Sequence, residues 1–150
     1  MYFVVKKVRV KLQSWDARQL SIAGRATLAQ LVLLSILGHF MQSMMILKKI
    51  SDEIEWLAWT FIWSTTDGRN KMSLVGWDSV CQPKDRSGLG MRQLHDQNIS
   101  FLLKLGYNMV FDEKSLWVQV IISKYGLDDS LPDSIKRGQS SFIWKSLSKV

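Results

Sequence analysis

The sequence predicts a mainly α-helical fold, an irregular bundle of five or six helices with a loop block containing glycine and proline in the middle. Two observations lead to this class. Apolar residues recur at helical spacing in several separate segments, and residues suited to helix starts precede some of them. The 150-residue chain is 47% hydrophobic and contains seven tryptophans, which argues against a disordered protein and allows a core.

The longest apolar segment, residues 20–46, predicts the central helix. Ser21 is the expected N-cap, because its hydroxyl can accept a hydrogen bond from a backbone N–H one turn ahead. Gly38 predicts a break or kink, after which a second short helix covers residues 40–47. Residues on or near one side of the first part are Ile22, Ala26, Leu28, Leu31, Val32 and Ser35. Because the segment is apolar nearly all round after Leu31, we expect burial between other elements.

A membrane-spanning helix is the competing interpretation of this segment. Residues 28–47 have about the length of a span. Polar side chains are scattered through the run and a glycine interrupts it, which argues against a span. These polar residues are Gln30, Ser35, His39, Gln42 and Ser43. We therefore expect no membrane partner.

The first 15 residues carry two patterns at once. Apolar residues at positions 8, 10 and 12 alternate as in a strand, whereas those at positions 5, 8, 12 and 15 recur as in a helix. Positive charge is concentrated here, since residues 1–30 hold six basic residues and one acidic residue. A basic end of this kind fits contact with a nucleic-acid backbone; a solvated positive face is the simpler alternative.

The rest of the chain is expected to be helical outside its loops. Helices are predicted over residues 51–63, 77–81, 96–111 and 114–125, with a last one beginning at 141–147. Ser51 or Asp52 is the expected N-cap of the helix over residues 51–63. The tryptophans of this helix, at positions 56, 59 and 63, are expected in the core; the alternative is that they stack on nucleic-acid bases. Gly88 and Gly90 are expected to adopt positive φ. Expected core positions in the later helices include Ile99, Leu102, Leu103, Gly106, Leu116, Val120 and Ile121.

Several ordered motifs resemble one known family. Residues 20–28 read LSxAGRxxL, residues 75–94 follow VxWxxVCxPKxxGGLGxRxL closely, and residues 116–125 resemble LWxxVxxxKY. The set is similar to plant non-LTR (LINE-type) retrotransposon reverse transcriptases, also described as ribonuclease H-like proteins. Ser87 departs from the pattern, because the family usually has the first of two glycines there. The VRxKLxxW pattern of residues 8–15 also resembles the family and favours a helix for the first segment.

The resemblance covers nearly the whole chain and implies the thumb and connector that follow the polymerase palm. Residues 1–64 would be the thumb-like part and residues 65–150 a connector part, truncated at its end, of one folding unit. Such a piece is expected to be non-catalytic on its own, because the Tyr-x-Asp-Asp residues of the palm and the convergent carboxylates of ribonuclease H are missing. Asp128 and Asp129 follow Tyr125 with one residue too many to match. His39, Cys81 and His95 lack zinc-ligand spacing, so no metal or other cofactor is expected.

The implied role is to help grip the RNA/DNA primer–template duplex, with the palm of the parent polymerase as a protein partner. Charge placement and the resemblance together assign backbone contacts to Lys6, Lys7, Arg9, Lys11, Arg18 and Arg25. A helical protein-interaction module is one alternative, and a decayed retroelement fragment without function is another. The single cysteine favours an intracellular setting, with a nuclear location left open.

Overall fold

The computed structural model describes residues 2–16, 19–64, 75–112, 114–125 and 146–147. The mainly α-helical class is confirmed, since these residues contain six α-helices and the short 3-10 helix η2. Their bounds are α1 Tyr2–Gln13, α2 Ile22–Ser43, α3 Lys48–Trp63, α4 Trp77–Cys81, η2 Lys84–Arg86, α5 Leu94–Phe111 and α6 Leu116–Tyr125. The chain forms two compact units, one of residues 1–40 with 46–97 and one of residues 41–45 with 98–150. The division into thumb-like and connector parts stays a prediction.

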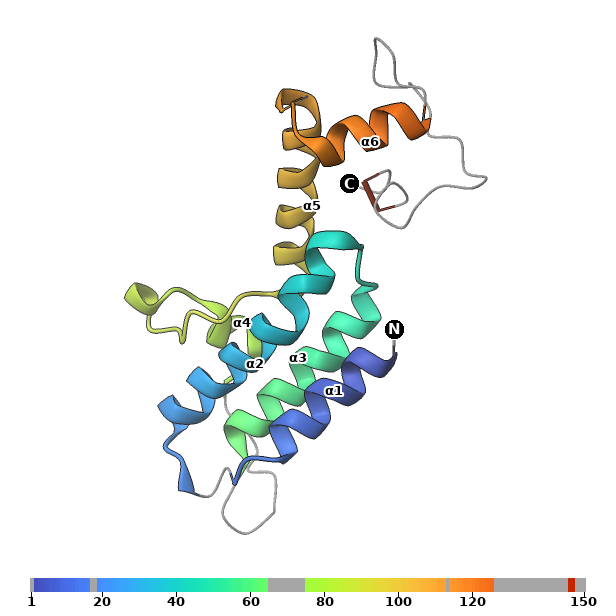
Figure 1. Cartoon of the computed structure of the whole chain (residues 1–150). Helices are drawn as coiled ribbons and strands as arrows, with labels where there is room; N and C mark the ends of the chain where they lie inside the picture. Colours follow the sequence, from blue (N-terminus) through green and yellow to red (C-terminus); the bar gives the residue numbers. More distant parts are fainter. Residues whose placement is uncertain (1, 17–18, 65–74, 113, 126–145, 148–150) are drawn as a thin grey trace. The chain divides into compact units, whose positions relative to one another are not determined.

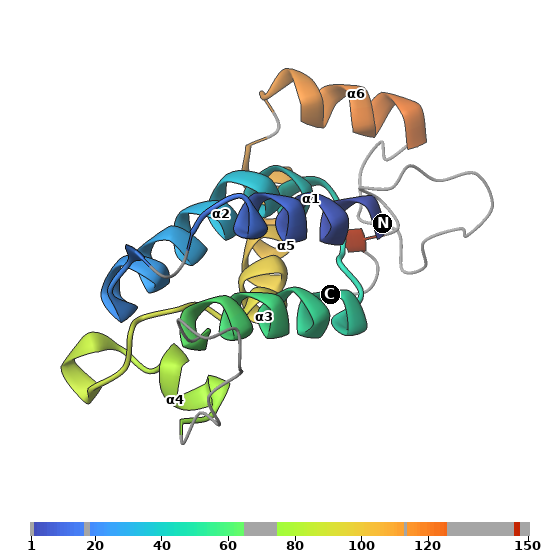
Figure 2. The same ribbon diagram turned by 90° about the horizontal axis from the view of Figure 1, so that it is seen from below.

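In the first unit, α1, α2 and α3 lie side by side (Figures 1 and 2), and α1 packs directly on α3. Each helix buries one apolar stripe that follows the 3.6-residue period. The stripes consist of Val4, Val5, Val8 and Leu12; Ala26, Ala29, Val32, Leu33 and Leu37; and Ile50, Ile54, Ala58, Phe61 and Ile62. Full burial of a side chain such as Ile54 contributes about 1.5–3 kcal/mol, so this core is the main force holding the three helices. The first segment is therefore a helix and not a strand.

The helix α2 begins where the sequence predicts, but it does not break where the sequence predicts. Gly24 N donates to Ser21 Oγ over 3.2 Å, which confirms Ser21 as the N-cap. The helix then runs unbroken through Gly38 to Ser43, so the predicted break and second short helix are wrong. A glycine costs a helix interior only about 1 kcal/mol. Burial of the preceding Leu37, which is 0% exposed, outweighs that cost.

The buried face of α2 also differs from the predicted one. Ile22 and Leu31 are 50% and 57% exposed, whereas Ala29 is fully buried. Leu34 is exposed as well, so the expectation of burial all round is wrong. Apolar residues occupy more than one side of this helix, and periodicity alone could not select the side that the fold covers. Among the described helices α2 meets the length and hydropathy of a membrane span, a test that a soluble protein's core helix also passes.

The helix α3 begins at Lys48, earlier than predicted. Ser51 lies within it and is buried, so the predicted caps at Ser51 or Asp52 are wrong. Instead, Leu47 O accepts the first helical hydrogen bonds, including one of 2.8 Å from the backbone N–H three residues ahead. Trp56 is 58% exposed, so its predicted place in the core is wrong; the other two tryptophans of that stripe are half-buried.

The loop block after α4 folds tightly back on itself. Gly90 N donates to Gln82 O over 3.0 Å. Positive φ occurs at Ser87 (63°) and Gly90 (67°), so the prediction is confirmed for Gly90 and wrong for Gly88. Gly88 is required for a different reason, because a Cβ there would lie 1.9 Å from Gln82 O. The backbone approaches too closely at this point for any side chain.

In the second unit, Asn98 of α5 holds the segment that ends α2. Its side-chain amide donates to Met41 O over 2.9 Å and to Met44 O over 3.0 Å. Met45 N donates to Ser146 Oγ over 2.8 Å. These two bonds from Asn98 give partners to backbone carbonyls at and just after the C-terminal end of α2, where helical N–H donors are missing.

The core predictions for α5 and α6 are only partly right. Leu102 is fully buried as expected. Three other predicted core residues are exposed, by 56%, 79% and 63%: Leu103, Leu116 and Val120. Among the residues of α6 whose burial is described, the buried one is Val118, on a different face. The predicted loop at 127–140 and most of the last helix lie outside the described residues.

Candidate nucleic-acid interface

An open groove follows the outer face of α1 beside α2. It has a volume of about 640 Å³, and every lining residue but one comes from α1 and the turn after it. These residues are Phe3, Lys6, Lys7, Val10, Lys11 and Ser14, joined by Ile36 of α2. Their spacing of three and four residues places them along one side of the helix. We call Lys6, Lys7 and Lys11 the lysine stripe.

The lysine stripe is positively charged and accessible. All three side chains belong to exposed residues, and within the described part of the chain none forms an ion pair with a carboxylate. The Lys7 ammonium lies 5.8 Å from the centre of the Phe3 ring, and that of Lys11 lies 5.9 Å from the Trp15 ring. Such cation–π contacts orient the ammonium groups while leaving their charge uncompensated. The stripe can therefore attract a polyanion.

Arg9 lies outside this groove. Its Nη2 pairs with Glu53 Oε1 of α3 at 3.4 Å, and both side chains are partly exposed. An exposed pair of this kind contributes at most about 1 kcal/mol. It does, however, reduce the positive charge that Arg9 presents to a partner.

Arg25 is engaged within the fold. Its Nε donates to Leu20 O over 3.1 Å, and its Nη1 donates to Ile62 O over 3.4 Å and also to Ser64 O. The two latter carbonyls belong to the end of α3, where helical partners are missing. The guanidinium therefore joins the start of α2 to the end of α3. Arg18, the remaining predicted contact, lies outside the described residues.

The sequence prediction missed the apolar part of the groove. Phe3 and Val10 are 52% and 58% exposed, and Ile36 contributes from α2. The signal was present, since Phe3, Lys7 and Val10 follow helical spacing on a side separate from the buried valines. The involvement of α2 could not be predicted, because it depends on how α1 packs.

Among the described residues, Glu55 and Cys81 have clearly raised pKa values. Burial raises the pKa of Glu55, whose Oε1 accepts a hydrogen bond of 2.6 Å from Leu94 N. Burial, together with Glu55 and Asp78, raises the pKa of the Cys81 thiol to about 12. A thiol of this kind is not a nucleophile at neutral pH. Across the described ranges, no three His, Cys, Asp or Glu side chains are grouped so that they could hold a metal ion.

Comparison with known proteins places the chain beside plant sequences. It is 33% identical over 147 residues to an Arabidopsis thaliana protein named "putative ribonuclease H protein", and the match covers 96% of this chain and 24% of that protein. It is 28% identical over 88 residues to an Arabidopsis thaliana protein named "uncharacterized mitochondrial protein", covering 58% of this chain and 57% of that one. The chain thus spans about a quarter and about half of these relatives. No protein-family model and no solved structure matches.

The two relatives support a relationship with the retroelement proteins that the motifs resemble. The match to the first runs through nearly all of the described helices. It therefore concerns the sequence of most of the chain and not a single motif.

Proposed function

We propose that this chain is a segment of a retroelement-derived protein and that it binds nucleic acid through the lysine stripe. In the parent protein it would form the thumb and connector after the polymerase palm and help to hold the primer–template duplex. The observation that carries the proposal is the placement of Lys6, Lys7 and Lys11 on one accessible side of α1. Each ammonium can neutralise a phosphate and release a counterion, which drives sequence-independent binding.

The set of proposed binding residues is smaller than the set of basic residues in this region. Lys6, Lys7 and Lys11 carry the binding in this proposal, and Arg9 adds to it at the cost of its pair with Glu53. Arg25 is left out of the binding surface, because its guanidinium is committed to three backbone carbonyls. Nucleic acid could recruit Arg25 only by breaking the connection between α2 and α3.

The test is to change the lysine stripe to glutamine (Lys6→Gln, Lys7→Gln and Lys11→Gln together) and to measure binding of a labelled RNA/DNA hybrid by fluorescence anisotropy. A matched control changes Lys48, Lys49 and Lys84 to glutamine, because these exposed residues give the same change in net charge. Affinity should fall for the stripe variant and stay near wild type for the control. The slope of log affinity against log salt, between about 50 and 200 mM, should flatten by about 0.9 for each phosphate that the variant no longer neutralises. Equal effects of both variants would contradict a localised site.

A second candidate function is a helical protein-interaction module. It is favoured by an exposed apolar stripe on α5, formed by Leu103, Tyr107, Val110 and Phe111. The rings of Tyr107 and Phe111 stack at 4.3 Å between centres. An apolar surface of this kind is typical of an interface. Association that persists at high salt and disappears on Phe111→Ser would support this candidate, because the lysine stripe would predict the opposite salt response.

A further inference from the structure

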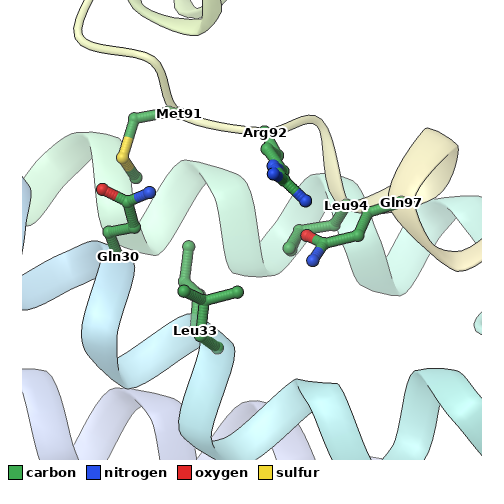
Figure 3. Close-up of a pocket in the computed structure, with 7 residues that line it drawn as sticks. Gln30, Leu33, Met91, Arg92, Leu94 and Gln97 are labelled. Carbon is green, nitrogen blue, oxygen red and sulfur yellow. The ribbon is translucent and has the colours of Figure 1, made fainter.

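A small pocket opens in the first unit between α2 and the segment of residues 91–97, which includes the first turn of α5 (Figure 3). Its volume is about 160 Å³. Leu33, Met91 and Leu94 line it and are each less than 5% exposed, so their side chains form a firm apolar wall. An enclosed apolar cavity of about 150 Å³ is known to hold one benzene ring. This pocket has a similar volume but is open to solvent, so it can receive part of a flat ring system while the rest of the ligand stays outside.

Three polar side chains also line this pocket. Gln30 comes from α2, Arg92 from the segment before α5, and Gln97 from the first turn of α5 (Figure 3). Within the described part of the chain, none of the three side chains makes a hydrogen bond or an ion pair. Both glutamines are half-buried, and neither amide belongs to the buried groups left without a partner, so both can bond to solvent or to a ligand. The pocket thus offers one guanidinium and two amides to a ligand.

These groups match the hydrogen-bonding edges of a guanine base. Arg92 can only donate, and the O6 and N7 atoms of guanine form a pair of acceptors with the geometry that arginine prefers. The amide oxygens of Gln30 and Gln97 can accept from the N1–H and N2–H₂ groups of the same base. The thioether of Met91, which is 3% exposed, can contact the ring favourably. No carboxylate lines the pocket, so nothing repels a nucleotide.

A carboxylate or a free phosphate fits less well. Either would pair with Arg92, but both are strongly hydrated and gain nothing from the wall formed by Leu33, Met91 and Leu94. Adenine presents a donor where Arg92 requires an acceptor. A flat base with an acceptor pair satisfies both the apolar wall and the polar rim.

We propose that this pocket receives one unstacked guanine base of a single-stranded nucleic acid. This rests on the proposed function, because it assumes that nucleic acid is the partner of the protein. It goes beyond it, since the lysine stripe reads only the charge of the backbone, whereas this pocket reads a base. Single strands are the usual targets for such reading, because their bases are free to leave the stack.

The first experiment compares single-stranded oligouridines that differ only at the central position, which is guanine, adenine or abasic. The guanine form should bind wild-type protein about tenfold tighter than the abasic form, as expected for one good arginine–guanine pair. Arg92→Met, at an exposed position, should remove this preference, so that the guanine and abasic forms bind with equal affinity. The lysine-stripe variant should weaken all three oligonucleotides and keep the ratio. Binding without a guanine preference would overturn the pocket and leave the proposed function intact.

The second experiment separates the two proposals if no oligonucleotide binds. Guanosine monophosphate is titrated into ¹⁵N-labelled protein, and the side-chain amide signals of Gln30 and Gln97 are followed by NMR. Selective shifts with guanosine but not uridine monophosphate, absent in Arg92→Met, would keep the base pocket and reject the lysine stripe as a strand-binding site. No shift of either signal, together with no guanine preference, would overturn the pocket.

Discussion

Glu55 of α3 caps the first turn of α5, because its Oε1 accepts a hydrogen bond of 2.6 Å from Leu94 N. Leu94 is the first residue of α5, and its N–H is one of the groups that a helix cannot satisfy internally. A carboxylate at this position also suits the positive end of the helix. The bond crosses 39 positions of sequence and fixes the segment that lines the guanine pocket.

Replacing Glu55 should show how much its hydrogen bond with Leu94 N contributes to stability. We expect Glu55→Ala to lower the free energy of unfolding by about 1 kcal/mol, within the range measured for removal of helix caps. Glu55→Gln should have a smaller effect, because its amide oxygen can still accept from Leu94 N. Urea denaturation followed by circular dichroism measures both values. Equal stability of the alanine and wild-type proteins would mean that the bond contributes nothing.

The pH dependence of stability should change in the same variants. Burial raises the folded-state pKa of Glu55 above its ordinary value of 4.5, while the hydrogen bond from Leu94 N partly opposes this shift. Between the unfolded and folded pKa values the native state binds more protons, so this group makes stability fall as pH rises through that window. In Glu55→Gln this component should vanish, and unfolding midpoints measured from pH 4.5 upward would reveal it. A variant that keeps the wild-type fall would assign it to other carboxylates.

Arg25 should matter for stability more than for binding. Its hydrogen bonds to Leu20 O, Ile62 O and Ser64 O are made by a charged donor, and each such bond contributes about 1.5–3 kcal/mol when well formed. We expect Arg25→Gln to lower the free energy of unfolding by at least about 1.5 kcal/mol. Arg25→Lys should not restore it, because one ammonium cannot reproduce the guanidinium fork. Full stability of the lysine variant would show that charge alone suffices.

Sequence reasoning predicted helix positions better than helix faces. The cap at Ser21 and the short helix α4 followed from local patterns, because their causes lie within a few residues. The faces of α2, α5 and α6 did not, since apolar residues such as Leu31, Leu103 and Val120 occupy sides that the fold leaves open. In the candidate site, charge placement named the three lysines that line the groove, and their binding role stays a prediction. The contacts of Arg9 and Arg25 could not be predicted, because their partners lie 44 and 37 positions away in the sequence.

Substitutions at the neighbouring positions Ser87 and Gly88 of the loop block should change stability in opposite directions. Ser87 adopts a left-handed conformation with φ of 63°, which costs a non-glycine residue about 1–2 kcal/mol. Ser87→Gly should therefore be neutral or stabilise by up to about 1 kcal/mol, and it restores the glycine usual in the family that the motifs resemble. Gly88→Ala should destabilise strongly, because its Cβ would meet Gln82 O at 1.9 Å. Thermal unfolding of both variants tests the pair, and a destabilised Ser87→Gly would contradict the backbone assignment.

Asn98 should be sensitive to substitution, because its side chain is buried and bonded. It is 1% exposed, and its amide donates to Met41 O and Met44 O at 2.9 and 3.0 Å. Asn98→Leu has a similar volume but leaves both carbonyls without these donors, at a cost of about 1–3 kcal/mol for each buried group left unsatisfied. Asn98→Asp should also lower the free energy of unfolding, because a carboxylate cannot donate to two carbonyls and its charge would be buried. Hydrogen exchange should show faster exchange around residues 41–45 in both variants, whereas unchanged protection there would mean that other contacts hold the end of α2.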